Sequence, residues 1–214
     1  PKTVNIRLLA LNCYVGSVGR PELKLTLVRI QQKPFLENVI SNEDYTYFKR
    51  KLNNPAERYW YFVIRFLAAT GARISELLQI KVEHVSAGFI DLYSKGGKVR
   101  RIYIPAKLKD EATEWLNKRD QSSGFIFINR KGERITARGV AAQLKKLATK
   151  YKLNTAVVYP HSFRHRFAKN FLDHFNDISL LADLMGHESI ETTRIYLRRT
   201  STEQQTIVDR VVTW

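Results

Sequence analysis

The stretch RYWYFVIRFLAATGARISEL, residues 58–77, carries the pattern that decides the fold. Between residues 60 and 67 it is apolar on nearly every side, which predicts a helix buried at the centre of a helical domain. Gly71 ends that helix, because glycine accepts the left-handed backbone conformation that closes helices. Arg73 then begins a short helix, and Glu76 lies one turn further on.

Other helices and one hairpin are predicted on both sides of this stretch. Upstream, Ser41 caps a helix that runs through Leu52, and Pro55 is placed to open the central helix. Downstream, residues 88–104 alternate in polarity around Gly96-Gly97, which predicts a β-hairpin. Further helices are expected over 2–15, 107–118, 136–151, 160–175, 178–185 and 189–199, with a short strand over 125–128. The predicted fold class is mainly α with a small antiparallel β-sheet (α+β).

The composition points to a globular protein with a polyanionic partner. Apolar residues make up 44% of the 214 residues and charged residues 26%, which is ordinary for a globular chain. Lys and Arg outnumber Asp and Glu by 36 to 20, a formal net charge of +16. Such a surplus favours nucleic acid, since neutralising phosphates releases counterions. An anionic membrane is the rival partner, but the chain has no run of about 18 apolar residues, and no membrane association is predicted.

The single cysteine bears on the cellular setting. Cys13 cannot form an internal disulfide or build a cysteine-rich zinc site. Its apolar neighbours predict a small core residue, and a reducing, cytoplasmic or nucleoid-associated location fits. The chain starts at Pro1 in the middle of a helical pattern, so we expect the natural protein to begin further upstream.

Two of four notable segments place strong cationic donors beside helix ends or turns. Arg73 follows a Gly-Ala step at a helix start, where the helix dipole adds to the positive potential that attracts a phosphate. A surface ion pair between Arg73 and Glu76 would leave the same pattern. Lys95 lies at the hairpin turn, from where it could reach into a groove and deliver a proton. A basic turn that only touches backbone phosphates is the alternative.

The other two segments contain histidines and a tyrosine. His161 and Arg164 are three residues apart, so they share a helix face and can meet one phosphate. His165 is four residues from His161, but no metal-binding pattern accompanies the pair, and packing or a supporting role is predicted for it. His187 follows the helix-ending Gly186, and Tyr196 lies nine residues later. One tyrosine in a helix is usually a packing residue.

Taken together, the four segments favour phosphate chemistry without metal. They contain arginines, a lysine, histidines and a tyrosine, but no carboxylate pair of the kind that two-metal nucleases need. Such a set of donors suits an anionic transition state. A tyrosine activated in these surroundings could form a covalent bond to phosphorus.

In the order and spacing of these motifs the chain resembles the tyrosine recombinases, or phage-type integrases, including Xer-like proteins and conjugative-transposon integrases. The motifs are Thr-Gly-Ala-Arg73-Ile-Ser-Glu-Leu, Lys95-Gly-Gly-Lys, His161-Ser-Phe-Arg164-His and Met-Gly-His187 with Tyr196 nine residues after His187. The resemblance implies the tyrosine recombinase catalytic-domain fold over residues 35–200. It also implies that residues 1–16 are the last helix of a truncated core-binding domain, that 17–34 are a linker, and that 201–214 are a tail that docks in trans.

The resemblance further implies a role for each site residue. Tyr196 would attack the scissile phosphate and hold the 3′ end as a phosphotyrosine, while Arg73, Arg164 and His187 would bind the non-bridging oxygens. Lys95 would protonate the departing 5′ oxygen, with Lys98 as the alternative. His161 would accept or relay the tyrosine proton. Glu76 would orient Arg73, and His165 would support the site.

The function implied is site-specific recombination of double-stranded DNA, by a homo-oligomer that is a tetramer in synapsis. No metal, ATP or other cofactor is expected, because the phosphotyrosine conserves the energy of the phosphodiester. A type IB topoisomerase-like activity and a non-catalytic DNA-binding protein are the alternatives. Further DNA contacts are predicted for Lys98, Arg100, Arg101, Lys145, Lys146, Arg166 and Arg194.

Overall fold

The computed structural model describes residues 2–29, 38–93, 99–187, 189–197 and 208–212. By its internal contacts the chain divides into two compact units, residues 1–34 and 35–214. None of the described helices has both the length and the apolar character required to cross a bilayer.

The first unit is a helix followed by a segment that its side chains hold. Helix α1 spans Lys2–Ser17, two residues beyond the predicted end, and the 3-10 helix η1 spans Pro21–Leu23. Asn12 binds both the amide and the carbonyl of Leu25, each at 2.8 Å. Asn5 binds Val28 in the same way, at 2.9 and 2.8 Å. The segment is extended as predicted, but it pairs with asparagine side chains and not with another strand. Cys13 is exposed on α1, so the prediction that it is a core residue is wrong.

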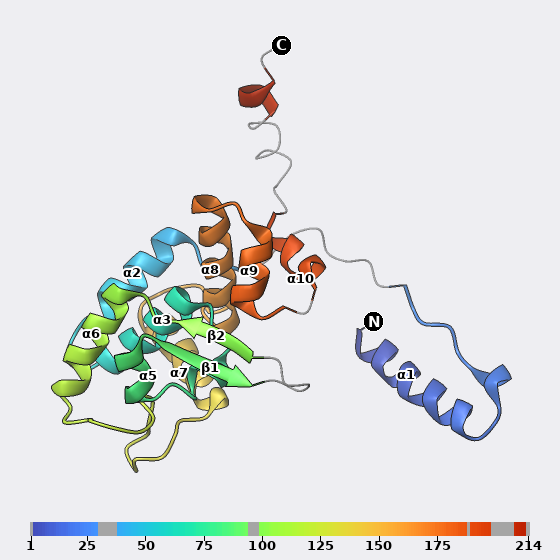
Figure 1. Ribbon diagram of the computed structural model, residues 1–214, viewed down its shortest axis with the longest axis horizontal. Coiled ribbons are helices and arrows are strands. Elements are labelled where there is room, and N and C mark those ends of the chain that lie inside the picture. Colours follow the sequence, from blue (N-terminus) through green and yellow to red (C-terminus); the bar gives the residue numbers. More distant parts are fainter. Residues whose placement is uncertain (1, 30–37, 94–98, 188, 198–207, 213–214) are drawn as a thin grey trace. The chain divides into compact units, whose positions relative to one another are not determined.

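The second unit is mainly helical with one hairpin, which confirms the predicted fold class (Figure 1). Its elements in chain order are α2 (Asn42–Leu52), α3 (Arg58–Thr70), α4 (Ile74–Leu77), α5 (Val82–Ala87), β1 (Phe89–Tyr93), β2 (Val99–Tyr103), α6 (Ala106–Asn117), α7 (Ala137–Lys150), α8 (Pro160–His174), α9 (Ile178–Met185), α10 (Ile190–Arg194) and the 3-10 helix η2 (Ile195–Leu197).

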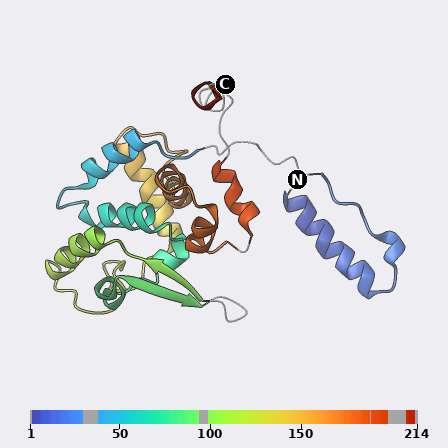
Figure 2. The same cartoon turned by 45° about the horizontal axis from the view of Figure 1, so that its top comes forward.

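Helix α3 is the buried centre of this unit, as its sequence predicts. Phe62, Val63 and Ile64 are fully buried although successive residues of a helix point to different sides. The helix contacts α2, α6 and α8, and it passes through the middle of the unit in both views (Figures 1 and 2). Burying several faces of one helix organises the other elements around it, because each must cover part of its apolar surface.

The alternation of the hairpin decides which of two neighbouring arginines faces inward. Strands β1 and β2 pair antiparallel, with Ile90 opposite Ile102 and Leu92 opposite Arg100. Ile90 and Ile102 are buried. Since residues two apart in a strand share a face, Arg100 lies on the inner face and Arg101 on the outer one.

Helices α8, α9 and α10 form a second packing group beside the hairpin. Leu172, Leu181, Met185 and Tyr196 build its small apolar core. Helix α9 contacts both α8 and β2, and these helices lie together in Figures 1 and 2. Tyr196 therefore belongs to a packed cluster at the edge of the unit and does not project into solvent.

Some element boundaries differ from those predicted. Helix α3 begins at Arg58 and not at Pro55, because residues 55–57 form a turn in which the Glu57 amide donates to the Asn54 carbonyl at 3.2 Å. The segment 125–128 makes only isolated bridges, Lys81 with Phe125 and Ile128 with Arg134, and so is not a strand. Helix α5 was not predicted from the sequence.

Gly71 joins α3 to the arginine that follows it. Its φ is +62°, and a Cβ atom at this position would lie 2.4 Å from the Phe167 ring on α8. Both the backbone conformation and the lack of space therefore require glycine here.

Replacing Gly71 with alanine should destabilise the protein by more than about 2 kcal/mol, since the left-handed conformation costs about 1–2 kcal/mol and overpacking against Phe167 costs about 1–3 kcal/mol. Urea unfolding measures the loss. The matched control is Gly132→Ala, where φ is +79° but nothing lies within 4 Å. Equal losses in the two variants would contradict the packing argument.

Candidate active site

Three arginines from different elements converge on the C-terminal end of helix α9. Arg100 donates from Nε and Nη2 to the Leu184 carbonyl at 3.1 and 2.8 Å. Arg164 donates from Nη2 to the Met185 carbonyl at 2.6 Å. Arg73 donates from Nη2 to the Gly186 carbonyl at 3.0 Å. The last carbonyls of a helix lack partners within the helix and carry partial negative charge, so they attract cations.

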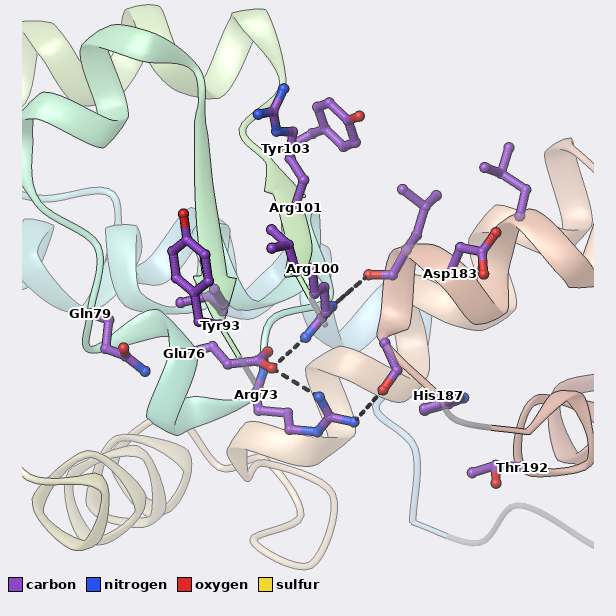
Figure 3. A pocket seen from close by; sticks show the side chains of 15 residues that line it. Arg73, Glu76, Gln79, Tyr93, Arg100, Arg101, Tyr103, Asp183, His187 and Thr192 are labelled. Atoms are coloured by element: carbon purple, nitrogen blue, oxygen red, sulfur yellow. Dashed lines mark hydrogen bonds and ion pairs between the residues drawn. The ribbon is translucent and has the colours of Figure 1, made fainter. Parts of the chain in front are cut away.

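The carboxylate of Glu76 contacts the same three guanidinium groups, and Figure 3 shows its contacts with Arg73 and Arg100. It accepts from the Arg73 amide at 2.7 Å and from Arg73 Nη1 at 2.8 Å. It also accepts from Arg100 Nη1 and lies 3.9 Å from Arg164 Nη1. Burial raises the pKa of Glu76, but the hydrogen bonds from Arg73 and Arg100 outweigh burial and lower that pKa overall. One carboxylate among three guanidinium groups leaves the cluster positively charged.

The three arginines differ in how far solvent reaches them. The side chain of Arg164 is 1% exposed, that of Arg100 11% and that of Arg73 42%. Burial and the neighbouring arginines lower the pKa of Arg164 to about 10, so it stays charged at neutral pH. Its Nη1 donates to the Gly71 carbonyl at 2.6 Å. Its buried Nε finds no hydrogen-bond partner among the described residues.

His187 lies in the turn after α9 and contacts Arg164. Its Nε2 is 3.1 Å from Arg164 Nη2, and its Nδ1 is 2.7 Å from the buried Thr193 hydroxyl. Because a guanidinium only donates, Nε2 must accept and Nδ1 must carry the proton. Burial and the charges of Arg164, Arg73 and Arg100 lower the pKa of His187 to about 4. His187 is therefore neutral, and it could donate to an anion from Nε2 only after that nitrogen gains a proton.

Tyr196 lies on η2 with its hydroxyl directed at helix α8. The residue is 7% exposed, and its hydroxyl lies 2.9 Å from Nδ1 of His165. Burial raises the pKa of Tyr196 to about 12, although Arg164 and Arg73 act in the other direction. The His161 ring packs edge-on against the His165 ring, with 4.2 Å between ring centroids. The sequence placed His161 next to the tyrosine proton, whereas the structure places His165 there.

A cavity of about 950 Å³ adjoins this cluster, and Arg73, Arg100 and His187 lie on its wall (Figure 3). Tyr93 and Tyr103 of the hairpin line it from one side, and Leu180 of α9 lines it from another. Of the three clustered arginines, Arg73 offers the most exposed guanidinium to this cavity.

The other predicted DNA contacts are placed unevenly. Arg101 is bound to Asp91 through two bonds of 2.7 Å, and Arg194 is paired with Glu191 at 2.9 Å. Lys145 and Lys146 are exposed on α7. Arg166 stacks on Tyr45, with its Cζ 3.9 Å from the ring centroid. Lys95 and Lys98 lie outside the described residues. Arg100 and Arg166 face neighbouring elements of the protein and would need to leave these partners to contact DNA.

Two features of the site have no counterpart in the sequence motifs. The carbonyls of residues 184–186 bind the arginines through their backbone, and a backbone group leaves no trace in the residue identities. The Thr193 hydroxyl contacts Nδ1 of His187 and so orients the ring. Thr193 lies six residues after the histidine, and this nearness in the chain is the one sequence signal that could have identified it. No group of three or more His, Cys, Asp or Glu side chains in the described parts of the chain could hold a metal ion.

The chain belongs to the phage integrase family, whose sequence model matches residues 38–203. It is 34% identical over 154 residues to tyrosine recombinase XerA of Pyrococcus furiosus, covering 69% of this chain and 53% of that protein. It is 32% identical over 143 residues to tyrosine recombinase XerC of Lactobacillus delbrueckii subsp. bulgaricus, covering 63% and 48%. The chain therefore spans about half the length of the curated relatives it matches.

Solved structures share the fold. The crystal structure of XerA recombinase matches with a TM-score of 0.69 and 19% identity, over 100% of this chain and 78% of that one. The Tn1549 transposon integrase in complex with transposon right end DNA matches with a TM-score of 0.75 and 18% identity, over 99% and 80%. XerH site-specific recombinase bound to difH substrate matches with a TM-score of 0.72 and 24% identity, over 97% and 64%. The fold is that of tyrosine recombinase catalytic domains.

Replacing Glu76 with glutamine should destabilise the protein by about 3 kcal/mol, since it leaves buried guanidinium groups without their counter-ion. Because folding lowers the pKa of Glu76, its stabilisation is present at neutral pH and is lost as the pH falls through that lowered value. Urea unfolding at a series of pH values measures both effects, and the variant should lose less stability than the parent on acidification.

Glu114→Gln is the control for Glu76→Gln. Glu114 pairs with Lys118, but both side chains are largely exposed, at 66% and 72%. An exposed pair contributes at most about 1 kcal/mol. If both substitutions cost the same, the Glu76 carboxylate does not hold the arginine cluster together.

Proposed function

We propose that this chain carries the catalytic domain of a site-specific DNA recombinase that cuts and rejoins DNA through a 3′-phosphotyrosine intermediate. The observation that carries the proposal is the convergence of Arg73, Arg164 and His187 on one helix end beside the buried Tyr196. The charges of Arg164 and Arg73 act on the Tyr196 hydroxyl, which supports a single site for phosphate and nucleophile. The names of the curated relatives agree with this activity.

In the proposed reaction the scissile phosphate binds among the arginines. Arg73 contacts the non-bridging oxygens first, because its guanidinium is the most exposed of the three. Arg164 contributes the buried positive charge, and its unpartnered Nε offers a further donor. The negative charge of the phosphate makes protonation of His187 Nε2 more favourable, so that His187 then donates to the same oxygens. Fixed donors of this kind stabilise the charge that develops in the transition state.

The covalent step exchanges one phosphodiester for another. The Tyr196 oxygen attacks phosphorus and loses its proton, while the bond from phosphorus to the 5′ oxygen breaks. Lys95 supplies a proton to the departing 5′ oxygen, with Lys98 on the same turn as the alternative. The family resemblance assigns the tyrosine proton to His161, whereas His165 is the histidine that contacts the Tyr196 hydroxyl. Attack by another 5′ hydroxyl reverses the step, so the chemistry proposed needs neither ATP nor a metal ion.

Double-stranded DNA with a specific recombination site is the proposed partner, and several structural neighbours are described as complexes with DNA. We also propose a homo-oligomer on DNA, a tetramer in synapsis, in a cytoplasmic, nucleoid-associated setting. Exposed apolar side chains near the C-terminus, Val208, Val211 and Val212, support a tail that docks on a neighbouring subunit. The core-binding domain and linker assigned to residues 1–16 and 17–34 remain part of the same proposal.

Tyr196→Phe should abolish covalent attachment to DNA, because it removes only the attacking oxygen. The substrate is a pool of duplexes with random sequence, each carrying one nick, so that cleavage near the nick releases a short strand that diffuses away. Adducts that survive SDS are separated and sequenced. Tyr47→Phe, at a tyrosine on α2 whose ring lies beside Arg50 and Lys51, is the control and should form adducts at the rate of the unaltered chain.

An adduct with Tyr196→Phe, or none with the unaltered chain, would exclude this function and favour a DNA-binding protein without catalysis. A supercoiled plasmid that lacks the recovered sequence addresses the topoisomerase alternative. A recombinase should leave that plasmid supercoiled, whereas a type IB topoisomerase would relax it.

A further inference from the structure

The hydroxyl of Tyr196 contacts His165, a residue for which the sequence predicted only packing or a supporting role. His165 Nδ1 lies 2.9 Å from the tyrosine oxygen, and the two rings are 5.5 Å apart between centroids. Among the described residues this is the one hydrogen bond that the hydroxyl makes. His161 is exposed and touches the ring of His165. The two histidines lie one helical turn apart on α8, with His165 between His161 and the tyrosine.

The protonation of the two groups allows the hydroxyl to donate to the imidazole. Burial raises the pKa of Tyr196 to about 12, so the hydroxyl keeps its proton at neutral pH. Burial and the charges of His161, Arg164 and His187 lower the pKa of His165 to about 4, so the imidazole is neutral. In the tautomer with the imidazole proton on Nε2, Nδ1 accepts from the tyrosine hydroxyl, and this is the tautomer that the inference uses. In that tautomer the 2.9 Å contact pairs a nucleophile with a base.

We infer that His165 is the group that takes the proton of Tyr196 when its oxygen attacks phosphorus, an assignment that rests on the proposed recombinase function. The bond from Tyr196 to phosphorus forms, the bond from phosphorus to the 5′ oxygen breaks, and the tyrosine proton moves to His165 Nδ1. In the reverse reaction the His165 imidazolium returns this proton to the departing tyrosine oxygen. His161 lies one position further along, against the His165 ring, and acts on the tyrosine through His165.

The charges around His165 explain why the transfer would wait for DNA. An imidazolium beside Arg164, His161 and His187 is unfavourable while the site holds no anion. A bound phosphate adds negative charge next to these groups and lowers the cost of protonating His165. Bond formation to phosphorus also makes the tyrosine hydroxyl more acidic. The pair thus keeps the nucleophile protonated and oriented in the absence of DNA and activates it when phosphate is bound.

The test separates cleavage from ligation in His165→Asn. The asparagine oxygen can accept the tyrosine hydrogen bond in place of Nδ1, but it cannot take the proton. Cleavage of a nicked duplex of the recovered sequence is followed in single turnovers. Since general acid–base catalysis contributes about 10²–10⁴-fold, cleavage should slow by about 100-fold or more. His165→Gln is the second variant and should show the same loss.

Ligation is measured with a strand that ends in a 3′-phosphate p-nitrophenyl ester, using each variant in a Tyr196→Phe background. The p-nitrophenolate leaves as a stable anion and needs no proton, so loss of His165 should not slow its displacement by a 5′ hydroxyl. This reaction still depends on the arginines and His187, and it therefore reports whether the site is intact. His174→Asn, on the exposed end of α8, is the control and should change neither reaction.

Selective loss of cleavage in His165→Asn or His165→Gln supports the inference. Unchanged cleavage in both variants overturns it, and so does an equal loss of cleavage and ligation, which would mean a structural role. Selective loss of cleavage in His161→Asn, with normal cleavage in the His165 variants, also overturns the inference. That result would make His161 the residue that accepts the tyrosine proton. Failure of the proposed recombinase function is distinguishable from failure of the His165 assignment, because the unaltered chain would then form no adduct with DNA.

Discussion

The carboxylate of Glu76 holds three guanidinium groups that would otherwise repel one another. Arg73, Arg100 and Arg164 come from a helix start, a strand and a long helix, and each also donates to a carbonyl at the end of α9. These contacts join α4, the hairpin and α8 to the turn that carries His187. The positions of the three arginines and of His187 depend on this arrangement of charge.

The C-terminal end of α9 also offsets the positive charge of the arginines. The carbonyls of residues 184–186 supply partial negative charge to the three guanidinium groups. Because the positive charge of the arginines exceeds that of one carboxylate, the cluster still attracts a phosphate. Burial lowers the pKa values of His187 and His165, and the neighbouring positive charges add to this effect, so that both values are about 4 and both rings are neutral. Burial and electrostatics together thus set the protonation of the site.

The nucleophile depends on packing more than on charge. Tyr196 lies in the small apolar core that α8, α9 and η2 share, and His165 fixes the direction of its hydroxyl. Burial raises the pKa of Tyr196 more strongly than the arginines lower it. Activation of the tyrosine therefore requires a change in the site. Phosphate binding beside His165 would add negative charge, which favours protonation of His165 by the tyrosine hydroxyl.

The sequence by itself determined the helical class, the buried centre at α3, the hairpin and the helix ends at Gly71 and Gly186, because these follow from local periodicity and glycine conformation. It also singled out Arg73, Arg164, His187 and Tyr196 by their spacing. Only the tertiary structure decided that Arg100 faces inward to Glu76, that backbone carbonyls bind the arginines, and that His165 and not His161 meets Tyr196. Spacing on one helix places both histidines on the same face, and the packing of η2 against α8 selects the one that the hydroxyl reaches.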